Sequence, residues 1–120
     1  MKIIHQSLAG LLQELKARKV EQVRVAQFIR SEADPGGFPR YTSWVVVSAF
    51  LDWERWVEWR LFVGRARAEV TDQGVGLPRV LAELGPKLLS AVKAKIGEAG
   101  FTVSEGLVAH DADAVDGVLE

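Results

Sequence analysis

Residues 41–51, "YTSWVVVSAFL", constrain the fold of this chain more than any other segment. Alternate residues of a strand point to opposite faces of a sheet, and here both sets are apolar. One set contains Val45, Val47 and Ala49, and the other contains Trp44, Val46 and Phe50. β-Branched and aromatic residues favour strands, and a strand that is apolar on both sides is normally covered on both sides. We therefore predict a strand here, with both of its faces covered.

The segment before it also has the two-residue period of a strand. In residues 20–30, Val23, Val25 and Ile29 fall on one face, whereas the other face mixes polar and apolar side chains. That second face holds Gln22, Arg24, Ala26, Phe28 and Arg30. Residues 31–40 contain two prolines and Gly36-Gly37, so "DPGG" predicts a turn that joins two strands.

Residues 53–70 include three of the four tryptophans, spaced three apart. A helix over 53–63 would place Trp53 and Trp56 on one stripe, but the flanking sequence alternates and favours a strand. Val57, Trp59, Leu61 and Val63 then share one face, opposite Trp56, Glu58, Arg60 and Phe62. After Gly64 the apolar set moves to Ala66 and Ala68, which predicts a bulge at Gly64. The hairpin turn falls at 52–55. We expect Trp59 in the core and Trp56 on the opposite face, half-exposed or at a subunit contact.

The remaining segments predict two main helices and a last strand. Leucines at helical spacing indicate a helix over residues 4–18, and a second apolar stripe indicates a helical segment over 77–98. Pro86 lies inside this segment and predicts either a kink or two abutting helices, 77–84 and 86–98. Residues 101–110 predict a strand. The resulting order is α-β-β-β-α-β, an α+β fold with an antiparallel four-stranded sheet.

The composition is that of a globular chain with an uneven charge. Residues 1–95 hold all 15 Lys and Arg against 10 Asp and Glu, a charge of +5, and residues 96–120 hold six acids and no base. We expect one α+β domain over 1–110 and an acidic tail or short helix over 111–120. The tail is either attracted to the basic body or competes with an anionic ligand for it. With no cysteine, signal peptide or membrane span predicted, we expect a cytoplasmic protein.

No sequence motif indicates catalysis, a cofactor or a metal. His5 lies near the start of the first predicted helix and His110 at the end of the last predicted strand. A metal site needs three or four converging ligands, so beside Asp111 and Asp113 we expect His110 to be a solvent-exposed strand end rather than a ligand. The "GVGLP" segment meets neither phosphate-loop pattern and is expected to be a turn. Glu54, Glu58 and Glu69 are expected to form a solvated face. We therefore favour a protein without enzymatic activity, with an enzyme or small-ligand protein that has a tryptophan-lined pocket as the alternative.

The most informative surface is the strand face that combines aromatic residues with arginines. If the other face is the core, this one presents Arg24, Phe28, Arg30, Trp56, Arg60 and Phe62, with Trp44 and Phe50 as further candidates. Such a surface is typical of a protein interface, most simply in a homodimer. It also suits bases and phosphates of nucleic acid, or a small ligand in a tryptophan-lined pocket. If the two helices cover opposite faces of the sheet, these aromatic residues are simply core.

The predicted order of elements resembles two known families in topology alone. Over residues 4–98 it resembles that of double-stranded RNA-binding domains, whose basic helix start has counterparts only in Lys87, Lys93 and Lys95. The complete order is similar to that of small acidic secretion chaperones that dimerise. The first resemblance implies RNA binding and the second a protein partner, and both are analogies of fold.

Overall fold

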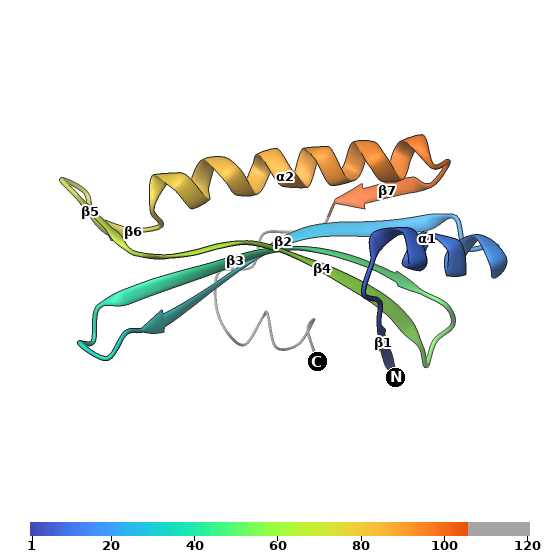
Figure 1. The fold of residues 1–120 in the computed structure, drawn as a ribbon, viewed down its shortest axis with the longest axis horizontal. Helices are drawn as coiled ribbons and strands as arrows, with labels where there is room; N and C mark the ends of the chain where they lie inside the picture. The colour runs from blue at the N-terminus through green and yellow to red at the C-terminus, as the bar shows by residue number, and fades with distance from the viewer. Residues whose placement is uncertain (106–120) are drawn as a thin grey trace.

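A computed structural model describes residues 1–105, which form an α+β fold with two helices on a mostly sheet core (Figure 1). The N-terminal half contains β1 (Lys2–Ile4), α1 (Leu8–Ala17), β2 (Gln22–Ala33) and β3 (Pro39–Phe50). The C-terminal half contains β4 (Trp56–Arg67), β5 (Glu69–Thr71), β6 (Gly74–Gly76), α2 (Arg79–Glu98) and β7 (Thr102–Glu105).

The main sheet has five strands and mixed pairing, which corrects the prediction of four antiparallel strands. Its order is β1-β4-β3-β2-β7. The three long strands pair antiparallel as predicted, whereas β1 runs parallel to β4 and β7 runs parallel to β2. β5 and β6 form a separate two-stranded hairpin, in a segment that we expected to be a loop. β1 and this hairpin consist of three-residue strands, too short to show a clear period.

The register of β3 and β4 confirms the predicted hairpin and its bulge. Ser43 pairs with Gly64 and Trp44 with Phe62, so Val63 is the extra residue on β4. The bulge restores Gly64 and Ala66 to the apolar face. An alanine Cβ at Gly64 would lie 2.9 Å from a methyl carbon of Leu81, so α2 lies directly above this position.

The two turns that join these strands are each held by an aspartate. Asp34 Oδ1 accepts hydrogen bonds from the backbone N–H groups of Gly36 and Phe38, which confirms the predicted "DPGG" turn. Asp52 Oδ1 accepts from the N–H groups of Glu54 and Arg55. The hydrogen bond from the Phe38 amide is the main reason that the pKa of Asp34 lies below its usual range. For Asp52, a hydrogen bond from the Arg55 side chain is the main cause of the same lowering of the pKa.

Both helices lie on one side of the main sheet (Figure 1). The core fills the space between the helices and the sheet, and Val23, Val25, Val57 and Val63 contribute to it on the predicted apolar faces. Trp59 packs against this core, half-buried, as the strand alternation predicts. The buried members are Leu11, Leu15, Val23, Val25, Val45, Val47, Ala49, Val57, Val63, Leu81, Leu89, Val92, Ile96 and Phe101.

The helices differ from prediction at their ends. α1 begins at Leu8 because Ser7 caps it, with its hydroxyl accepting a hydrogen bond from the Gly10 N–H, and Ile4 belongs to β1 instead. α2 is one helix that contains Pro86, which rules out the alternative of two abutting helices. Beside Pro86, Gly85 is buried against Gln27 of β2: a Cβ there would lie 2.1 Å from Gln27 Nε2. The helix and the sheet therefore approach each other closely at this point.

Among residues 1–105, no helix is long and apolar enough to span a membrane. The predicted acidic tail over 111–120, the boundary at residue 110 and His110 lie outside the described residues.

Candidate functional site

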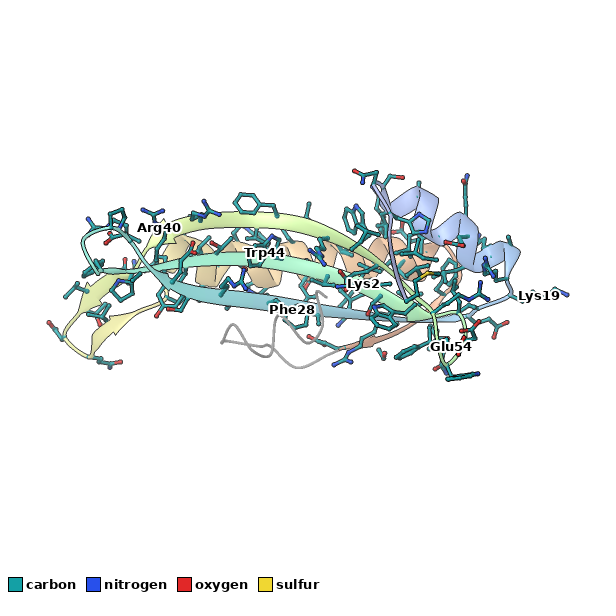
Figure 2. All side chains as sticks on the ribbon, turned by 90° about the horizontal axis from the view of Figure 1, so that it is seen from below. Lys2, Lys19, Phe28, Arg40, Trp44 and Glu54 are labelled. Carbon is teal, nitrogen blue, oxygen red and sulfur yellow. The ribbon has the colours of Figure 1, made fainter. Side chains whose placement is uncertain are left out.

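The sheet face turned away from both helices, called the helix-free face here, gathers the side chains singled out in the sequence. Figure 2 looks onto this face, with α2 behind the strands and with Phe28 and Trp44 near the middle of the sheet. The strand register places Phe28, Trp44 and Phe62 in one row across β2, β3 and β4. Trp56 lies opposite Phe50 in another row. The residues proposed from sequence therefore come from three strands to one face.

These aromatic residues differ in how much they are exposed. Phe28 is 3% exposed and forms a small second cluster with Ala26, Val46 and Trp44. Phe62, in the same row, is 56% exposed, and Phe50 is 71% exposed. Helices cover one face of β3 as predicted, whereas its other face carries the buried Val46 as well as the exposed Phe50. Among the described residues of the helix-free face, Phe62 and Phe50 are the most exposed aromatic side chains.

Arginines surround the aromatic row. Arg60 belongs to the adjacent row on one side. Arg30 and Arg65 belong to the adjacent row on the other side, where both pair with Thr42. Arg65 Nε donates to Thr42 Oγ1 over 3.2 Å. Near the far end of the sheet Arg67 lies 4.6 Å from the centre of the Phe38 ring and 3.1 Å from Asp34 Oδ2. The row of Phe28, Trp44 and Phe62 therefore has an arginine-containing row on each side.

A hollow of about 410 Å³ opens at the end of the helix-free face where β1 and β7 flank the long strands. Its size falls within the range typical of small-molecule sites. Phe50 and Trp56 form part of its wall, with ring centres 6.4 Å apart at an interplanar angle of 63°. The lining residues are Gln22, Val23, Arg24, Ser48, Ala49, Phe50, Trp56, Glu58 and Ser104.

Glu58 is the most unusual side chain of this hollow, and the expectation that it belongs to a solvated face is wrong. Its side chain is fully buried. Oε2 accepts a 2.7 Å hydrogen bond from Arg60 Nε and lies 3.9 Å from Lys2 Nζ. Oε1 is buried without a hydrogen-bond partner. Sequence alternation alone could not reveal this, because Lys2 reaches Glu58 from β1, which was not predicted.

Two arginines lie close to Glu58 and the hollow, and Trp53 lies in the turn that precedes Trp56. Arg24 is exposed at the rim of the hollow, and Arg60 approaches from the next row of the sheet. Trp53 is 89% exposed in the turn between β3 and β4. Backbone bonds from the Trp56 N–H to Met1 and from the His5 N–H to Glu58 fix β1 beside β4. This pairing places Lys2 Nζ 3.9 Å from Glu58 Oε2.

The described residues hold no cluster of three or more side chains able to bind a metal ion. His5 is instead paired with Glu14 of α1, at 2.6 Å between Nε2 and Oε1. This hydrogen bond from His5 is the main reason that the pKa of Glu14 lies below its usual range, with a further contribution from Arg18. The pair ties the segment that precedes α1 to the second turn of the helix.

Comparisons with protein-family models, curated proteins and solved structures found no match to this chain. Functional conclusions therefore rest on the side chains of the helix-free face and of its hollow.

Proposed function

We propose that this chain is a non-enzymatic binding module that uses its helix-free sheet face to contact a protein partner, in the first place a second copy of itself. The observation that carries the proposal is Phe62, 56% exposed at the end of an aromatic row and bordered by Arg60 and Arg65. Aromatic residues and arginine are the residue types that most often anchor protein interfaces.

The edge position of Phe62 supports the same proposal. Within residues 1–105, β1 pairs with β4 only as far as Glu58, so the rest of β4 has a strand neighbour on one side only. An unpaired edge offers main-chain donors and acceptors to a second strand. A two-fold symmetric contact uses the same patch on both copies, which suits an aromatic side chain at such an edge.

Sedimentation equilibrium of the full chain tests this proposal. We expect a reversible dimer at tens of micromolar, and Phe62→Ser should weaken it by about tenfold or more, as for an interface anchor. Val80→Ser is the matched control, because Val80 is 60% exposed on α2, on the other side of the molecule. A wild-type monomer at these concentrations, or equal effects of the two substitutions, would contradict the proposal.

The arginine rows favour nucleic acid as a second candidate partner. Arg30 and Arg65 lie beside the row of Phe28, Trp44 and Phe62, an arrangement that can stack bases and bind phosphates. Binding of a single-stranded or duplex oligonucleotide should then weaken steeply as salt rises, because counterions are released. Arg65→Gln should reduce both the affinity and the salt dependence. Oligonucleotide binding that is absent at low salt removes this candidate and leaves the dimer proposal standing.

A further inference from the structure

We infer that the hollow around Glu58 binds a small planar ligand that donates a neutral N–H to Glu58 Oε1 and directs an anionic group toward Arg24. This site lies at the end of the helix-free face and is separate from the Phe62 edge. It needs no partner chain, so it stands independently of the proposed protein contact.

The demand for a hydrogen-bond donor comes from Glu58 itself. Its carboxylate is fully buried, and Oε1 has no partner whereas Oε2 accepts from Arg60 Nε at 2.7 Å. Buried acceptors without a partner are rare, since they lose the hydrogen bonds of water without replacement, and the cost is larger for a charged group. A donor supplied by a ligand in the adjoining hollow would satisfy Oε1.

The charges around Glu58 select a neutral donor rather than a cation. Arg60 and Lys2 already place two positive charges near Oε2, at 2.7 Å and 3.9 Å. A third cation next to them would be repelled in a site of low dielectric constant. The N–H of a heteroaromatic ring supplies the hydrogen bond without that repulsion.

The wall and the rim of the hollow specify the rest of the ligand. Phe50 and Trp56 meet edge to face along one side, and such aromatic walls favour a flat ring. At the rim Arg24 is exposed, and its guanidinium suits a carboxylate or a phosphate. The volume of about 410 Å³ fits one such ring with its substituent rather than a macromolecular segment.

Isothermal titration calorimetry on the full-length chain tests the donor. The probes are indole-3-acetate, its N-methylated analogue, which keeps the ring and the carboxylate but lacks the N–H, and guanosine monophosphate, which carries ring N–H groups and a phosphate. We expect saturable binding of indole-3-acetate or of guanosine monophosphate with a Kd below ~1 mM. If only one of these two probes binds, the result shows whether the site prefers a carboxylate or a phosphate as the anionic group. Methylation of the indole nitrogen should weaken binding by about tenfold or more, because it leaves Oε1 unsatisfied.

Two substitutions separate the two halves of the site. Glu58→Gln should weaken binding of the N–H-bearing probe by about tenfold. When the oxygen of the new glutamine amide accepts from Arg60, its NH₂ group faces the ligand and cannot accept the ligand N–H. Arg24→Gln, at an exposed position expected to keep the fold, should weaken binding of indole-3-acetate but not of the uncharged indole-3-acetamide. Arg79→Gln is the matched control, because Arg79 is an exposed arginine of α2, on the other side of the sheet and outside the hollow.

Three outcomes would overturn the inference: no saturable binding of either anionic probe, equal affinity for the methylated and unmethylated indoles, or equal effects of Arg24→Gln and Arg79→Gln. The Arg24→Gln result is decisive even if Glu58→Gln fails to fold. Sedimentation without ligand reports separately on the dimer, so the failure of one proposal is distinguishable from the failure of the other.

Discussion

Lys19 carries the single positive φ of a non-glycine residue among residues 1–105, at 59°. It follows α1, where the Val20 N–H bonds to the Leu15 carbonyl and closes the helix end. Left-handed backbone is strained for residues that carry a Cβ, and glycine is the usual residue at this position. The sequence shows cations at the helix end, as predicted, but not which of them adopts this conformation.

Lys19→Gly should therefore raise the free energy of unfolding by about 1 kcal/mol. Chemical denaturation measures the change. Arg18→Gly serves as the control, because Arg18 has an ordinary φ of −96° and should lose stability on the same substitution. A loss of stability in both variants would show that Lys19 is not left-handed.

The contact between Gly85 and Gln27 cannot be predicted from sequence periodicity, because this contact depends on how closely α2 approaches β2. Gln27 is buried and donates to Ser43 Oγ over 3.3 Å, so its amide has little room to move. Gly85→Ala should destabilise the fold by about 1–3 kcal/mol despite the better helix propensity of alanine. The penalty should be smaller in a Gln27→Ala background. Equal penalties in the two backgrounds, measured in a double-mutant cycle by denaturation, would contradict this close approach.

At the scale of elements, the long strands were predictable and the short ones were not. Twelve-residue strands such as β2, β3 and β4 display their alternation many times, and the switch of parity after Gly64 revealed the bulge. β1 owes its pairing to the neighbouring Trp56 and Glu58 rather than to its own sequence. Helix α2 continues through Pro86 because its packing on the sheet outweighs one lost hydrogen bond.

The two faces of β4 predict different roles for its tryptophans. Trp59 packs against the main core, so Trp59→Ala should cost about 3 kcal/mol of stability. Trp56 is half-buried beside Phe50 on the helix-free face, so Trp56→Ala should cost about 1 kcal/mol. Chemical unfolding of both variants measures the difference. Equal losses would contradict the register of the β3–β4 hairpin.

In the whole molecule, the arrangement of the two helices determines whether the aromatic residues are buried. The sequence did not predict this arrangement. Amphipathic stripes show that each helix has one buried side, but not which sheet face it covers. With α1 and α2 on the same side, Phe62 and Phe50 remain exposed rather than core. The buried carboxylate of Glu58 could not be predicted either, because strand alternation gave it the same status as its exposed neighbours.

Global stability should fall in acid through Glu14. Its hydrogen bond with His5 lowers the pKa of the folded state, so the unfolded chain binds the proton more readily. The stabilisation is thus present above the usual glutamate value of about 4.5 and is lost as the pH falls through the folded pKa. Glu14→Gln should reduce stability near neutral pH and flatten its decline below about pH 5. Glu83→Gln, at an exposed position on α2, is the control, and parallel pH profiles for Glu14→Gln and wild type would contradict this role.

If the helix-free face contacts a second copy of the chain, the four tryptophan indole N–H signals report on that contact directly. Trp44 and Trp56 lie on that face, Trp59 lies under the helices, and Trp53 is exposed in the turn. NMR spectra of the nitrogen-labelled chain should be recorded over about a hundredfold dilution. We expect the indole signals of Trp44 and Trp56 to shift with concentration while the Trp59 signal stays constant. Shifts confined to Trp59 and the α2 amides, or no shift at any concentration, would contradict it.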